Sequence, residues 1–213
     1  MEFILDPLLV VVLVLNLFVL GNSRLRAVVH LAALQGALLG VISLLVRQHV
    51  ELEAVLAAAA VIMLKGIVIP RMLLRALREA EIKREVEPLI GLLPSMILGA
   101  LATGLAIIFA DQLPLVDGHA TVLLVPASLA TVLAGFILLV TRFKAISQVI
   151  GYLILENGIF IFGMLLVDAM PLIVELGVLL DLFVGIFVIC IIVNHINRAF
   201  SSLDTRRLTE LKE

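Results

Sequence analysis

Four ionisable side chains stand inside long apolar segments of the chain, where a charge is costly. They are Lys65, Glu156, Asp181 and Glu175. A charged residue at the centre of a bilayer costs about 2.5–3.5 kcal/mol or more, so such residues usually serve an ion or proton path or a tight partner. Glu175 lies near the predicted end of its segment and is read as interfacial. Lys65, Glu156 and Asp181 are therefore the strongest candidates for chemistry.

Glu156 and Asp181 lie on two neighbouring apolar segments that a tight turn at 168–171 joins. The two acids are equally far from this turn, roughly 19 Å along a helix that rises about 1.5 Å per residue. The spacing predicts an antiparallel hairpin with both carboxylates at one depth, near the middle of the membrane. A desolvated carboxyl group exchanges protons near neutral pH more readily than an exposed one, as a proton relay requires.

Polar or small residues accompany both acids at helical spacing. Gln148 and Tyr152 precede Glu156 on one face of its segment and are expected to carry water or hydrogen bonds toward it. Glycines lie four residues to either side of Asp181, which would give another helix close access to this carboxylate. The pattern favours a site built between helices.

Lys65 has two interpretations, and so do the acids. Its positive charge would either modulate the acids or extend along the helix to the membrane surface. Glu156 and Asp181 would be either proton-exchanging groups or hydrogen-bonded anchors between helices. The sequence leaves these alternatives open.

The rest of the sequence forms an apolar frame. Of the 213 residues, 63% are hydrophobic, whereas a soluble domain is about 45–50% apolar. A membrane-spanning helix needs about 20 mainly apolar residues. The predicted spans are about 3–20, 25–46, 51–70, 90–110, 119–140, 146–167 and 171–193. The expected fold class is all-α, a polytopic membrane protein with about seven transmembrane helices.

Basic residues are divided unequally between the two sides of this predicted bundle. Of the 15 Lys and Arg residues, all but Arg47 and Lys65 follow odd-numbered spans. The positive-inside rule then places the N-terminus outside and the C-terminus in the cytoplasm. Residues 71–89 are expected to be a charged cytoplasmic linker with a helical extension.

Several classes of function find no support in the composition. The net charge of −2 does not suggest a nucleic-acid partner. The only cysteine, Cys190, excludes a disulfide within the chain and a cysteine cage for a metal. The four histidines lack the spacing of metal ligands. We therefore expect no metal, no cofactor and no catalytic centre in this chain.

Residues 150–163, IGYLILENGIFIFG, resemble the glutamate-bearing helix of the K-type subunit of complex I and its relatives. Those relatives include the C-type subunit of Mrp cation/proton antiporters and hydrogenase-4 component E. In this family an asparagine or another small polar residue follows the glutamate, as Asn157 follows Glu156 here. The next helix carries a second acid, matched by Asp181 in place of the usual glutamate, or alternatively by Glu175. The chain length, the C-terminal hairpin and the polar tail are similar to hydrogenase-4 component E.

This resemblance implies a division of the chain and a set of partners. It divides the chain into a five-helix membrane region (1–139), an acidic two-helix hairpin (140–193) and a cytoplasmic tail (194–213). It implies a non-catalytic membrane-arm subunit of a group 4 [NiFe]-hydrogenase-like or complex I-like complex in a prokaryotic inner membrane. The implied partners are antiporter-like and quinone-binding-type subunits, and a peripheral arm that carries [NiFe] and iron–sulfur clusters.

The resemblance also implies roles for the candidate residues. The proton path would comprise Glu156, Asp181, Lys65 and Glu175, supported by Gln148, Tyr152 and Asn157. Two alternatives are a subunit of a multisubunit cation/proton antiporter without a redox partner and a purely structural assembly subunit. An independent solute carrier is disfavoured, because the sequence shows no two-fold repeat and no pair of broken helices.

Overall fold

The computed structural model describes residues 2–46, 52–79, 89–113, 123–165 and 177 of the chain. All regular elements within these residues are helices. They are α1 (Glu2–Gly21), α2 (Leu25–Val46), α3 (Leu52–Val61), the π-helix η1 (Ile62–Val68), α4 (Ile69–Glu79), α5 (Leu92–Ala110), α6 (Leu124–Thr141) and α7 (Ala145–Met164). The described part of the chain is thus all-helical, as the composition predicted.

Six stretches in the described residues are long and apolar enough to cross a membrane: Ile4–Gly21, Leu25–Val46, Leu52–Arg78, Leu92–Ala110, Leu124–Thr141 and Ile146–Met164. They confirm six predicted spans, with the largest differences at two ends. The third continues beyond residue 70, so the expected helical extension of the linker is present up to Glu79. The fifth begins at Leu124, so Pro126 lies in the first turn of α6, where a proline is tolerated and need not kink the helix. The predicted seventh span, 171–193, lies outside the described residues except for Gly177, and the orientation of the chain stays a prediction.

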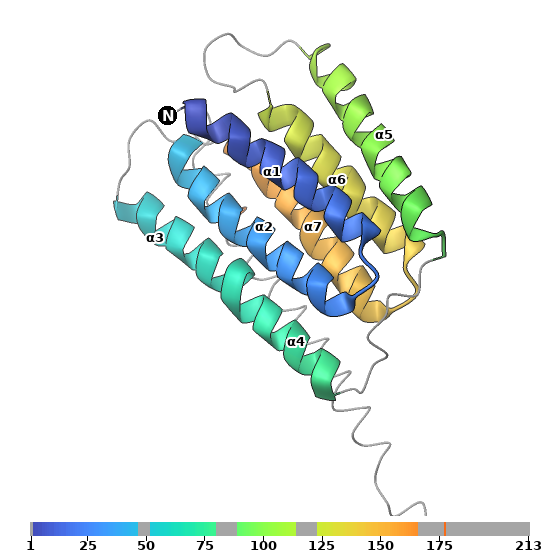
Figure 1. Cartoon of the computed structure of the whole chain (residues 1–213). Helices are drawn as coiled ribbons and strands as arrows, with labels where there is room; N and C mark the ends of the chain where they lie inside the picture. Colours follow the sequence, from blue (N-terminus) through green and yellow to red (C-terminus); the bar gives the residue numbers. More distant parts are fainter. Residues whose placement is uncertain (1, 47–51, 80–88, 114–122, 166–176, 178–213) are drawn as a thin grey trace, which may run out of the picture.

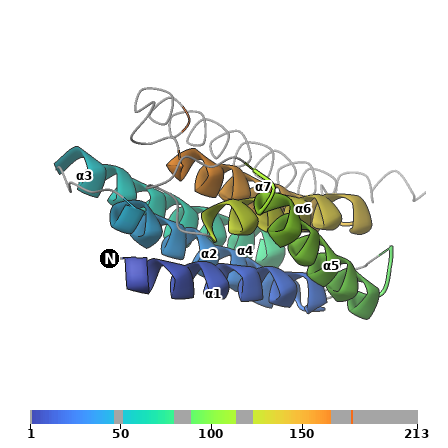
Figure 2. The ribbon, with the colours of Figure 1, turned by 90° about the horizontal axis from the view of Figure 1, so that it is seen from above.

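Four helices form the centre of the bundle. Helices α2 and α6 each contact both α1 and α7, and α1 and α7 lie on opposite sides of the molecule when it is viewed from above (Figure 2). The long helix α3–η1–α4 packs against α2, and α5 lies at the opposite edge against α1 and α6 (Figure 1). Buried apolar side chains between these helices make up the core.

One end of the bundle carries most of the described positive charge. Helices α1, α4 and α6 end there, and α2, α5 and α7 begin there (Figure 1). The exposed arginines at this end are Arg24, Arg26, Arg71, Arg75 and Arg78. We call it the basic end.

Helices α6 and α7 approach most closely at two glycines. A Cβ atom on Gly158 of α7 would lie 2.5 Å from the backbone nitrogen of Val132, and one on Gly135 of α6 would lie 2.5 Å from that of Leu155. Real Cβ atoms essentially never come this close to another heavy atom. The two backbones therefore touch, as is common where small residues line an interface between membrane helices. This contact fixes α7, which carries Glu156 and Asn157, against the rest of the bundle.

Arg142 connects α6 to α1 at the basic end. The side chain follows α6, is only 2% exposed, and donates from Nη2 to the carbonyl oxygen of Leu20 at 2.7 Å. The last carbonyls of a helix lack helical donors, so this guanidinium caps the end of α1. Burial lowers the pKa of Arg142 below its ordinary value, but an arginine remains charged at neutral pH.

We expect the substitution Arg142→Met to lower the free energy of unfolding by about 1.5–3 kcal/mol, the range for a hydrogen bond to a charged group. Methionine keeps much of the side-chain length but cannot donate to Leu20. Thermal unfolding of the purified protein in detergent measures the effect, with the exposed Arg26→Met as the matched control. Equal unfolding temperatures for the two variants would contradict the capping role.

Candidate functional site

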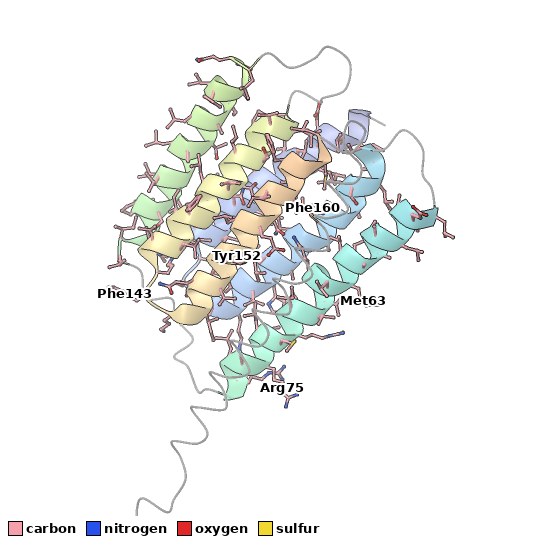
Figure 3. All side chains as sticks on the ribbon, turned by 180° about the vertical axis from the view of Figure 1, so that it is seen from behind. Met63, Arg75, Phe143, Tyr152 and Phe160 are labelled. Carbon is pink, nitrogen blue, oxygen red and sulfur yellow. The ribbon has the colours of Figure 1, made fainter. Side chains whose placement is uncertain are left out.

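A buried ion pair joins the π-helix to α7. Lys65 Nζ lies 3.1 Å from Glu156 Oε1, and the two side chains are only 6% and 5% exposed. Lys65 Nζ also donates to Asn157 Oδ1 at 3.3 Å and lies 5.1 Å from the centre of the Phe160 ring. Figure 3 shows Phe160 on α7, and Met63, two residues before Lys65, on the π-helix. The ammonium group is thus held by a carboxylate, an amide oxygen and an aromatic face, all from α7.

The backbone around Lys65 is specialised to place it there. Residues Ile62–Val68 form a π-helix, in which the N–H of Ile69 donates to the carbonyl of Leu64, five residues earlier. Such wide turns are rare and often lie at functional sites. Pro70 lies two residues after the end of the π-helix, and a wide turn relieves the clash between a proline ring and the preceding turn of an α-helix.

A glycine on α2 lets the π-helix come close enough to place this lysine in the interior. A Cβ atom on Gly36 would lie only 2.7 Å from Lys65 Cβ. Lys65 therefore sits at a point of close contact between α2 and η1, and the residue as a whole is buried. Its ammonium group does not extend to the surface in the described structure, and the interpretation that its charge modulates the acids stays a prediction.

A line of hydrogen-bonded side chains runs from the ion pair across the bundle. Asn157 Nδ2 donates to Gln35 Oε1 on α2 at 3.4 Å, and Gln35 Nε2 donates to Asn16 Oδ1 on α1 at 2.9 Å. Asn16 Nδ2 then donates to Thr131 Oγ1 on α6 at 2.9 Å, and Thr131 donates to the carbonyl of Ala127. All four side chains that form this line are buried. We call Asn157, Gln35, Asn16 and Thr131 the polar line.

The hydrogen bonds of the polar line all run in one direction. Each side chain accepts on the side that leads to Lys65 and donates on the side that leads away. The negative ends of the amide dipoles therefore face the ammonium group and favour its positive charge. An amide is both a donor and an acceptor of hydrogen bonds, so each amide of the polar line connects its two neighbours, and Asn157 connects the line to Lys65.

The other sequence-predicted residues are distributed differently. Gln148 is exposed and donates to the backbone carbonyl of Arg142 at 3.1 Å, near the start of α7. Tyr152 is half-buried and packs against the core at the basic end of α7 (Figure 3). Asp181 and Glu175 lie outside the described residues, so their relation to Glu156 stays a prediction. Among the described residues, no three His, Cys, Asp or Glu side chains lie close enough together to hold a metal ion.

Sequence reasoning missed three members of the polar line: Asn16, Gln35 and Thr131. A signal for the first two was present, because Asn16 is the sole amide in α1 and Gln35 the sole amide in α2. Polar side chains in membrane helices usually face the interior of the bundle and hydrogen-bond across helices. A search for ionisable residues alone passes over them.

Comparison with known proteins gives one relative over most of the chain and another over half of it. Rv0085 of Mycobacterium tuberculosis, described as an uncharacterized protein, is 35% identical over 200 residues, which are 93% of this chain and 91% of that protein. Hydrogenase-4 component E of Escherichia coli K12 is 31% identical over 101 residues, 47% of this chain and 46% of that protein. The match thus spans about half the length of the hydrogenase subunit, which confirms the predicted resemblance in part. No family model and no solved structure matches the chain.

Proposed function

Because this chain belongs to the same family as Rv0085 of Mycobacterium tuberculosis, and about half of it is similar to hydrogenase-4 component E, we propose that it is a membrane-arm subunit of a complex I-like or group 4 [NiFe]-hydrogenase-like complex. In this proposal the chain lies in a prokaryotic inner membrane with its basic end in the cytoplasm. It contributes a buried ion pair to a proton path and scaffolds its neighbours. The redox centres, [NiFe] and iron–sulfur, belong to partner subunits.

The observation that carries this proposal is the Lys65–Glu156 contact. Two opposite charges 3.1 Å apart attract one another by roughly 5 kcal/mol at an effective dielectric constant of about 20. A proton that binds Glu156 cancels this attraction and leaves Lys65 as an uncompensated cation. The positive charge of Lys65 then favours the ionised form of the next acid of the path, which we propose to be Asp181 or Glu175. Protonation at one site is thereby coupled to ionisation at the next.

The proposal assigns different tasks to the neighbouring residues. Glu156 takes up and releases the proton, and Lys65 sets the electrostatic cost of doing so. Asn157 and the rest of the polar line hold Lys65 in reach of Glu156, because each amide is itself fixed by hydrogen bonds. Gln148 and Tyr152 are proposed to line the approach along α7 from the basic end.

The substitution Glu156→Gln is expected to reduce proton translocation per assembled complex to background, because a glutamine amide cannot exchange the proton. Inverted membrane vesicles with a pH-sensitive dye measure translocation, normalised to the amount of this subunit in the purified complex. Asp181→Asn in the same assay distinguishes a pair of relay acids from a single one. Full translocation in Glu156→Gln complexes would overturn the relay role.

Two alternative functions make different predictions in the same preparation. A subunit of a cation/proton antiporter would purify with antiporter subunits alone, whereas the proposed complex would also contain [NiFe] and iron–sulfur proteins. A purely structural subunit would lose complex yield on substitution of Glu156 but keep the translocation rate of each assembled complex. The polar line between four helices is the observation that favours this second alternative.

A further inference from the structure

A narrow cavity lies between α2, the π-helix with α4, and α7. Lys65 and Asn157 form its polar lining, and the remaining lining is apolar, including Ala33, Leu73 and Leu153. The cavity has room for about one water molecule. The cavity is therefore about as wide as a water molecule, and Lys65 of the ion pair forms part of its wall.

Three helices independently place this cavity on the basic-end side of Lys65. Leu73 lies two turns beyond Lys65 toward the end of α4, and Val29 lies in the first two turns of α2. Leu153 lies before Glu156, toward the start of α7. All three positions lie on the basic-end side of the ion pair.

The contact between α2 and the π-helix is tight on the other side of Lys65. A Cβ atom on Gly40 would lie 2.4 Å from Ile62 Cγ1 and 3.1 Å from the carbonyl oxygen of Ala58. On either side of Gly40 in α2, the side chains of Leu39 and Ile42 are fully buried in an apolar cluster. Between α2 and the π-helix, the described residues thus leave space beside Lys65 toward the basic end and close it in the opposite direction.

We propose that this cavity is the access site through which water, and the protons it carries, reach the Lys65–Glu156 pair from the basic end. The inference rests on the proposed function. A buried water needs a space of about one probe sphere and two to four polar partners, and the cavity offers that space with Lys65 and Asn157 at its inner end. A hydrated metal cation is too large for such a space, and the ammonium group of Lys65 would repel it.

Hydroxyl-radical footprinting of the intact complex in its native membrane tests whether the cavity holds water. Radicals generated from isotopically labelled water oxidise the side chains that contact it. Leu73, 1% exposed, is expected to be labelled several-fold more than Leu39, an equally buried leucine (0%) in the apolar cluster on the other side of Lys65. Equal labelling of Leu73 and Leu39 would overturn the proposal.

Two variants test whether this water serves the path. Ala33→Leu fills the cavity and is expected to abolish the labelling of Leu73 and to slow proton translocation by an order of magnitude or more. Ala60→Leu, the same change at an exposed position on α3, controls for the added volume. Leu73→Ala widens the cavity without overpacking and is expected to increase the labelling of Leu153. This variant still tests the proposal if Ala33→Leu does not fold.

The outcomes separate this inference from the proposed function. Loss of labelling in Ala33→Leu with unchanged translocation would show a hydrated cavity that is not the route, and would overturn the inference alone. If Glu156→Gln complexes still translocate protons, the relay role is overturned. Leu73 labelling in those same complexes would then show that the cavity is hydrated all the same. Footprinting reads hydration directly and does not depend on turnover.

Discussion

The double substitution Lys65→Met with Glu156→Gln is expected to recover most of the stability that either single substitution removes, without recovering proton translocation. Removing one member of a buried ion pair leaves the other charge uncompensated, which typically costs about 3–5 kcal/mol. Removing both leaves two side chains of similar volume and no buried charge. The pair is only 6% and 5% exposed, so solvent cannot replace the lost partner.

Thermal unfolding of the purified chain and dye-based translocation by the assembled complex provide the two measurements. The single variants should unfold at lower temperature than the double variant, because each leaves one buried charge without its partner. Recovery of both stability and translocation in the double variant would assign the ion pair a structural role and reject the proton path.

The substitution Gly158→Ala is expected to destabilise the bundle, whereas Gly163→Ala, five residues later on the same helix, is expected to be neutral or slightly stabilising. The added methyl group at Gly158 would meet the backbone nitrogen of Val132 at 2.5 Å, while none of the described residues has an atom within 4 Å of the same group at Gly163. Overpacking of this kind costs about 1–3 kcal/mol or more. In a helix interior, alanine is otherwise favoured over glycine by about 0.8–1.0 kcal/mol.

The unfolding temperatures of the two glycine variants in detergent measure this difference directly. Gly158 also follows Asn157, so a displacement of α7 relative to α6 should change the distance between Glu156 and Lys65. We therefore expect Gly158→Ala, but not Gly163→Ala, to reduce proton translocation as well. Equal stability of the two variants would contradict the close contact between the helix backbones.

Much of the fold could be predicted because the thickness of a membrane fixes the minimum length of a spanning helix. Six predicted spans are present, since about 20 apolar residues are needed to cross the hydrocarbon whatever the tertiary structure. The same rule identified Lys65 and Glu156 as unusual, because a charge far from the ends of an apolar segment is costly in a membrane. Their pairing was not predictable, because it depends on how η1 and α7 are rotated about their axes, which interhelical packing decides.

The details of the site depend on features that leave little trace in the sequence. The π-helix at Ile62–Val68 differs from an α-helix by a widened turn, and only Pro70 hints at it. The polar line forms because Asn16, Gln35 and Thr131, from three separate helices, meet at one level of the bundle. The predicted relation of Glu156 to Asp181 concerns residues outside the described part of the chain and stays a prediction.

The widened turn at Ile62–Val68 also determines the angular phase between the two halves of its helix. One residue added to or removed from an α-helix turns everything after it by about 100°. Lys65 faces inward and Arg71, Arg75 and Arg78 face outward on the same continuous helix. A single-residue deletion between Lys65 and Arg71 would therefore rotate the basic residues of α4 relative to Lys65, so the turn sets the direction of the surface charges relative to the interior charge.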